Sequence, residues 1–193
     1  MTRLLLVLML ALIASPALAH PPPLGIGGFF GGVLHPLFVS AHLLALLGLG
    51  LLIGQAAQGS RPAALATIVA LTAGLLVMTL GFVPMLMGEA LLLLAVATGA
   101  LVALGRPLPE PAACAFGAVT GLAIALDSPP EVVSVREANL MLIGTGFGAT
   151  LLLIVVVEAA SRLQRPWLRI GARILGSWIA ASAILVLALR FAR

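Results

Sequence analysis

The chain carries few charged residues for its length. Of its 193 residues, 8% are charged and 62% are hydrophobic, and none is a lysine or a tyrosine. A soluble domain carries roughly 25% charged residues, so this composition excludes a soluble fold. The ten basic residues are all arginines. No basic stripe with interleaved aromatic residues is present, which excludes a nucleic-acid partner.

Cysteine and catalytic motifs are also scarce. Cys114 is the one cysteine, so no disulfide can form within the chain, and its apolar surroundings predict a small buried hydrophobe. No nucleophile lies beside a base, and no phosphate-binding loop is present. The two histidines of the first long apolar segment are seven residues apart, which is not the spacing of the zincin helix motif. We therefore expect that the protein is not an enzyme.

The first residues have the pattern of a secretory signal peptide. Arg3 precedes an apolar stretch over residues 4–14, and the A-x-A pattern of a cleavage site ends at Ala19. Cleavage after Ala19 would make His20 the first residue of the mature chain. The sequence thus predicts a signal peptide over residues 1–19, and the alternative is an uncleaved anchor helix.

Apolar segments then recur with short breaks, at intervals typical of membrane spans. Crossing a bilayer takes about 20 residues of helix. The segments cover approximately residues 24–55, 63–83, 89–104, 112–126, 138–160 and 170–189. Two of them are short, and the first is over-long with a glycine-rich start, which favours an irregular or re-entrant piece there. We predict an all-α membrane protein, a polytopic bundle of six transmembrane helices that forms a single domain over residues 20–193.

The arginines are distributed unevenly over the predicted loops. With the mature N-terminus outside, the outer connections hold Arg136 alone, and the inner loops hold Arg61, Arg106, Arg162, Arg165, Arg169 and Arg173. This asymmetry follows the positive-inside rule. It predicts a multi-pass protein of the bacterial inner (cytoplasmic) membrane, in contact with membrane lipids, with a periplasmic mature N-terminus.

Two histidines lie within the first apolar segment. His35 and His42 are seven residues apart, about two helical turns, so both rings are expected on roughly one helix face. Pro36 predicts a kink that frees carbonyl groups near His35. Ionisable groups inside a membrane are costly and mark functional sites, and imidazole is a common ligand of transition metals. The pair indicates a metal path through the membrane, and the alternative is two histidines hydrogen-bonded to neighbouring helices.

The residues around this pair resemble the first transmembrane motif of the HupE/UreJ family. The chain has the glycine and phenylalanines of residues 28–30, then residues 35–37 (His-Pro-Leu), then residues 42–45 (His-Leu-Leu-Ala). Family members are small polytopic proteins with a signal peptide and a His-Pro start, which His20 and the following proline match. The resemblance implies a permease for nickel or cobalt that supports hydrogenase and urease maturation. The metal is then a transported ion, and we expect no tightly bound cofactor.

The sequence departs from the family pattern at positions that bear on the ligand set. The family's glycine is Val39 here and its aspartate is Ala41, so the acid beside the second histidine is missing. The family's histidine-rich stretch after the fourth helix is replaced by residues 125–131, which contain no histidine. Glu131 stands where the family has a glutamate, and Asp127 offers an oxygen ligand. Such a site is expected to bind a divalent ion more weakly, or to bind another ion.

Two more residues complete the predicted set of metal-site residues. If cleavage exposes His20, its amine and ring nitrogen can chelate a metal ion. Glu89 opens the third helix, where the dipole favours a carboxylate, and its alternative role is a gate or first ligand that faces His35. The predicted metal-site residues are His35, His42, His20, Asp127, Glu131 and Glu89.

Two functions lead at this point, and a metal-storage, chaperone or sensor role is the remaining alternative. The first is transport of a divalent transition metal, with nickel first and cobalt second, from the periplasm to the cytoplasm. The second is a non-transporting structural or assembly subunit of a larger membrane complex or homo-oligomer. The missing acid at Ala41 and the missing second histidine cluster motivate the second function.

Overall fold

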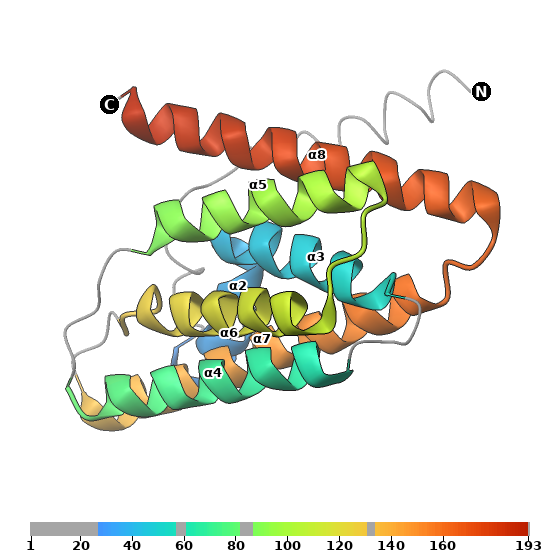
Figure 1. The fold of residues 1–193 in the computed structure, drawn as a ribbon. Helices are drawn as coiled ribbons and strands as arrows, with labels where there is room; N and C mark the ends of the chain where they lie inside the picture. The colour runs from blue at the N-terminus through green and yellow to red at the C-terminus, as the bar shows by residue number, and fades with distance from the viewer. Residues whose placement is uncertain (1–26, 57–60, 82–86, 131–133, 193) are drawn as a thin grey trace, which may run out of the picture.

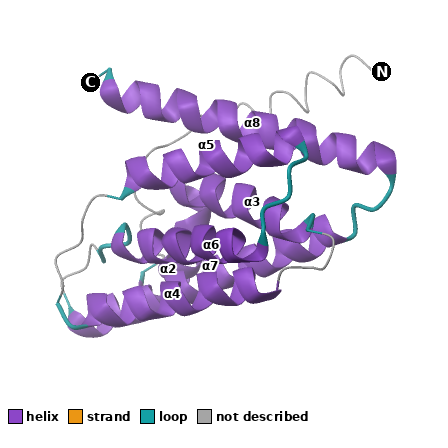
Figure 2. Ribbon diagram, in the orientation of Figure 1, coloured by secondary structure: helices purple, strands orange, loops and turns teal. Residues whose placement is uncertain are grey.

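The computed structural model describes residues 27–56, 61–81, 87–130 and 134–192. These ranges form seven α-helices and no strand (Figures 1 and 2), which confirms the predicted all-α class for the described part of the chain. The helices are α2 (Gly28–Phe38), α3 (Ser40–Gly54), α4 (Arg61–Thr79), α5 (Gly88–Leu104), α6 (Glu110–Leu126), α7 (Val135–Ser161) and α8 (Pro166–Phe191). The predicted signal peptide lies outside the described residues.

Local sequence signals explain where several helices begin and end. Pro111 and Pro166 stand in the first turns of α6 and α8. Amide groups in the first turn of a helix have no partner within the helix, so the missing N–H of proline costs no hydrogen bond there. α5 ends at Gly105, whose φ of 64° lies in the left-handed region that glycine favours. The Ser134 hydroxyl accepts a hydrogen bond from the Glu137 N–H at 3.2 Å and caps α7. Except at the break between α2 and α3, the predicted boundaries lie within about one helical turn of the observed ones.

Three helices, α4, α7 and α8, are long and apolar enough to cross a membrane. The bent pair α2 and α3 raises this number to four if the pair forms one span. α5 and α6 are apolar but have 17 residues each. At about 1.5 Å per residue each is about 25 Å long, against a hydrocarbon core of about 30 Å. The described chain therefore has the helices of a membrane protein, with three or four candidate spans.

The first apolar segment, where the sequence predicted an irregular or re-entrant piece, is broken between α2 and α3. Among the described glycines of its start, Gly27 is extended, and Gly28, Gly31 and Gly32 lie in α2. The chain then bends by 69° between α2 and α3 at Val39, whose backbone is extended (φ −85°, ψ 107°), so the pair is either a broken span or a re-entrant loop. The break comes three residues after Pro36, and the Val39 N–H donates to the His35 carbonyl at 3.1 Å. The His35 carbonyl itself therefore keeps its helical partner, whereas Pro36 has no N–H to offer the carbonyl four residues before it, that of Gly32.

Glycines in this segment serve close packing instead of an irregular backbone. A Cβ on Gly32 of α2 would collide with the Met141 carbonyl of α7, and a Cβ on Gly144 of α7 would collide with the Phe29 carbonyl of α2. A Cβ on Gly121 of α6 would collide with the backbone of α4, and a Cβ on Gly176 of α8 would collide with the backbone of α5. Small residues of this kind let helix backbones approach closely inside a membrane.

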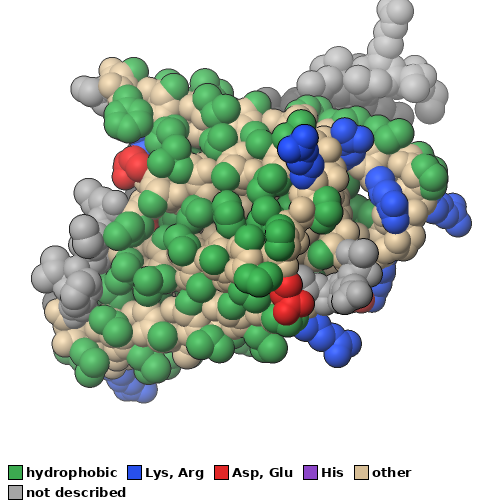
Figure 3. Space-filling model, viewed as in Figure 1, with side chains coloured by type: hydrophobic (Ala, Val, Ile, Leu, Met, Phe, Trp, Pro, Cys, Tyr) green, Lys and Arg blue, Asp and Glu red, His purple; other side chains and the backbone are tan. Residues whose placement is uncertain are grey.

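α3 is the central helix of the bundle (Figure 1), and it packs against α2, α5, α7 and α8. Eleven of its fifteen residues are buried, including Ala41 and His42 in its first turn. α8 is the opposite case, because most of its apolar side chains face outward, among them Trp167 and Trp178. Hydrophobic side chains also cover most of the face shown in Figure 3, as expected of a lipid-facing surface.

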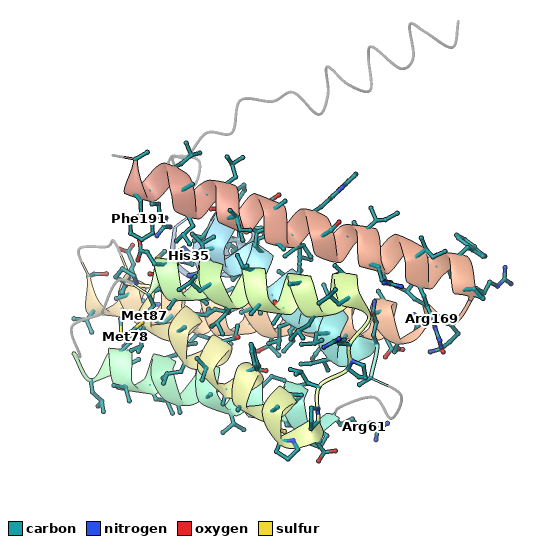
Figure 4. All side chains as sticks on the ribbon, turned by 45° about the horizontal axis from the view of Figure 1, so that its top comes forward. His35, Arg61, Met78, Met87, Arg169 and Phe191 are labelled. Atoms are coloured by element: carbon teal, nitrogen blue, oxygen red, sulfur yellow. The ribbon has the colours of Figure 1, made fainter. Side chains whose placement is uncertain are left out.

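The two ends of the bundle carry different charges. Most of the arginines visible in Figure 3 gather at one end, and Figure 4 places Arg61 and Arg169 together there. From the helix bounds, this end holds Arg61, Arg106, Glu110, Glu158, Arg162, Arg165, Arg169 and Arg173. The other end holds Glu89, Asp127, Arg136, Glu137 and Arg190. Among the described residues, the arginine asymmetry that the sequence predicted is therefore an asymmetry between the two ends of the folded bundle.

Candidate metal site

The two histidines of the first apolar segment lie side by side. His35 stands in the last turn of α2 and His42 in the first turn of α3. Their ring centroids are 5.1 Å apart, and the ring planes meet at 67°. The sequence predicted this proximity on the assumption that both rings lie on one face of a single helix, two turns apart. In the structure it arises across the 69° bend between the two helices.

Each ring has a buried nitrogen that lacks a hydrogen-bond partner. His42 is 0% exposed and His35 is partly buried. Nε2 of His35 and Nδ1 of His42 are buried, and neither has a partner among the described residues. A buried polar atom without a partner costs about 1–3 kcal/mol, so native structures rarely keep one without a reason. Two such atoms on adjacent imidazole rings suit a ligand that accepts nitrogen lone pairs.

Asp127 connects this pair to the end of α6. It is the C-cap residue of α6, and its Oδ2 lies 3.1 Å from Nε2 of His42. Its Oδ1 accepts a hydrogen bond from the Met87 N–H at 3.0 Å, just before α5 begins. Sequence reasoning treated Asp127 as an oxygen ligand. The structure shows both of its oxygens engaged, one with the histidine ring and one with the backbone.

The contact between His42 and Asp127 spans 85 residues of sequence. The sequence did not predict this contact, because the family pattern places an acid adjacent to His42, where this chain has Ala41, which is fully buried in the core. The available signal was an aspartate directly after an apolar helix, at the acidic end of the bundle. This position marks Asp127 as unusual, but it does not predict that His42 is its hydrogen-bond partner.

Glu89 lies at the same end but has a different partner. Its Oε1 accepts a hydrogen bond from Nη1 of Arg190 at 2.9 Å, which joins α5 to α8. The two side chains are 42% and 39% exposed. The Arg190 guanidinium packs directly over Gly88. The structure thus shows Glu89 in an exposed ion pair at the N-terminus of α5, where the dipole also favours a carboxylate.

The remaining predicted site residues are not described. His20 and Glu131 lie outside the described residues. Within the ranges that the structure describes, no group of three or more histidine, cysteine, aspartate or glutamate side chains is arranged to hold a metal ion. The described site therefore consists of His35 and His42 as nitrogen donors, with Asp127 bound to one of them. Figure 4 shows that His35 lies at the end of the bundle opposite Arg61 and Arg169.

Comparison with known proteins gives one match. A family model described as HupE / UreJ protein matches residues 7–186, nearly the whole chain, and so includes every described residue of the site. No curated protein and no solved structure gives a significant match.

Proposed function

The chain belongs to the HupE/UreJ family, and from this premise we propose that it transports a divalent transition metal ion, nickel or cobalt, across the bacterial inner membrane for metalloenzyme maturation. Family membership suggests a nickel or cobalt accessory or permease role. The transported ion is the substrate, and the histidine pair binds it transiently inside the bundle. In this proposal α2 and α3 form one span, and α5 and α6 also cross, which gives six spans.

The observation that carries the proposal is the pair of buried ring nitrogens without partners, on rings 5.1 Å apart. An ion about 2.1 Å from a ring nitrogen lies about 3.2 Å from that ring's centroid. Two rings that share such an ion with centroids 5.1 Å apart subtend an angle of about 105° at the metal. That angle suits two ligands of a tetrahedral ion, or two neighbouring ligands of an octahedral one with modest adjustment.

The charge distribution supports a direction of transport. His35 and Asp127 lie toward the end that carries Glu89 and Glu137, away from the arginine-rich end. The positive-inside rule assigns the arginine-rich end to the cytoplasm, so the ion enters at the acidic, periplasmic end. Acidic side chains there raise the local concentration of cations.

Nickel uptake by cells tests this function. In cells that express the full chain, His35→Ala and His42→Ala should each reduce uptake to the level of cells without the protein, because each removes one of two nitrogen donors. Ser128→Ala is the matched control, since Ser128 is buried, follows Asp127 in sequence, and its hydroxyl donates to the Ile124 carbonyl at 2.6 Å. Unchanged uptake in both histidine variants, at normal protein levels in the membrane, contradicts the proposal.

One observation favours a second function. The described residues offer no group of three metal-binding side chains, which suits a structural or assembly subunit that has lost the metal path. This function predicts that the protein co-purifies with a larger membrane complex and carries no metal when isolated. Stoichiometric nickel binding by the purified chain would exclude it.

A further inference from the structure

Resting on the proposed function, we propose that Asp127 is a positioning residue, which holds the His42 ring with Nε2 protonated and leaves Nδ1 as the atom that binds the metal ion. The acid comes from the end of α6 and acts on a ring at the start of α3. It replaces in space the carboxylate that is absent beside His42 in sequence.

The hydrogen bond between these two side chains selects the tautomer. Oδ2 of Asp127 is 3.1 Å from Nε2 of His42. An ionised carboxylate only accepts hydrogen bonds, so Nε2 must carry the proton. In a neutral imidazole the other nitrogen then has a free lone pair. That nitrogen, Nδ1, is the buried atom without a partner.

The carboxylate is itself fixed in place. Oδ1 of Asp127 accepts the Met87 N–H at 3.0 Å, and the Asp127 N–H bonds the Ala123 carbonyl at 3.0 Å within the last turn of α6. Hydrogen bonds to an ionised carboxylate are stronger than neutral ones. The His42 ring is therefore held between α3, α6 and the start of α5, with little freedom to rotate.

This arrangement has the form of a carboxylate–histidine–metal triad. A carboxylate that accepts the far N–H of a metal-binding imidazole fixes the ring and raises its basicity, and its loss lowers metal affinity by about 10- to 100-fold. The adjacent position, Ala41, is fully buried among apolar side chains and supplies no such acceptor. Metal affinity in this chain then depends on a contact between helices.

Cobalt binding to the purified full chain tests the role of Asp127. Isothermal titration with Co²⁺ should show affinity reduced by about 10- to 100-fold in Asp127→Ala. Asp127→Asn keeps one acceptor oxygen but loses the charge, so its loss should be smaller. One control should bind like the wild type: Ser128→Ala, which removes a neighbouring buried hydrogen bond. Size-exclusion profiles establish that each variant is folded.

The tautomer of His42 can be measured directly on the metal-free wild-type chain. Nitrogen NMR of the metal-free wild-type chain, labelled with ¹⁵N at histidine and assigned by comparison with His42→Ala, should show His42 protonated at Nε2. Asp127→Asn should retain part of this preference and Asp127→Ala should lose it. Protonation of wild-type His42 at Nδ1 overturns the positioning role.

The outcomes separate this inference from the function on which it rests. If the two histidine variants abolish Co²⁺ binding and both Asp127 variants bind like the wild type, the positioning role is refuted and the proposed function stands. If the histidine variants also bind like the wild type, the proposed function is refuted as well. Weaker binding in the Asp127 variants together with a loss of the Nε2–H form supports both.

Discussion

Gly144 sets how closely α7 approaches α2, and so fixes the position of His35. A Cβ at Gly144 would lie 2.9 Å from the Val33 nitrogen and would collide with the Phe29 carbonyl. These are backbone atoms, which cannot move aside as a flexible side chain can. We predict that Gly144→Ala forces the two helices apart and destabilises the protein.

Gly171→Ala provides the matched control for this substitution. Gly171 lies in α8, is exposed, and has no atom within 4 Å of a built Cβ. Both substitutions gain about 1 kcal/mol of helix propensity, whereas overpacking costs about 1–3 kcal/mol at Gly144 alone. The difference in unfolding free energy between the two variants therefore isolates the collision, at about 1–3 kcal/mol.

Thermal unfolding of the detergent-purified chain measures this difference. At about 2–4 °C per kcal/mol for a chain of this size, Gly144→Ala should unfold roughly 2–12 °C below Gly171→Ala. Its Co²⁺ affinity should also fall, because α2 carries His35 away from His42. Equal Tm values and equal affinities for the two variants would refute the claim that glycine packing positions the site.

Three further substitutions test individual contacts. Ser134→Ala removes the cap of α7 and should lower the free energy of unfolding by about 0.5–2 kcal/mol. The backbone amides of the first turn of α7 should then exchange faster with solvent, and unchanged exchange would contradict the capping role. Glu89→Gln breaks the exposed ion pair with Arg190 and should change the free energy of unfolding by about 0–1 kcal/mol. The change should be smaller at high salt, because salt screens exposed charges. A large change that does not depend on salt would contradict this. Glu158→Gln breaks the exposed ion pair between Glu158 and Arg162 at the C-terminal end of α7. It should leave the Tm and nickel uptake unchanged, and reduced uptake would place Glu158 on the metal path.

Much of the fold follows from local sequence signals. Apolar runs bounded by proline predicted α4 to α8 closely, because in a membrane every backbone group must be paired and a helix pairs them within one segment. The break at Val39 was not predictable in the same way. Pro36 and the glycines suggested irregular backbone, but the glycines pack against α7, and that contact joins segments more than 100 residues apart in sequence.

The candidate site was predictable only in part. His35 and His42 stood out because ionisable side chains are costly inside a membrane. Their helical spacing suggested that the rings lie together, although the structure brings them together through a bend. The bond between His42 and Asp127 depends on how α6 packs near α3, and no local pattern records that packing. The same limit applies to Glu89, whose partner Arg190 lies 101 residues further along the chain.

X-ray absorption spectroscopy of the nickel-loaded full chain tests the central claim most directly. The account predicts one ion per chain with two imidazole nitrogens at about 2.0–2.1 Å. The outer-shell signature of those rings should be absent from a His35→Ala/His42→Ala double variant that remains folded. A wild-type spectrum without imidazole ligands, or the same spectrum in the double variant, would contradict it.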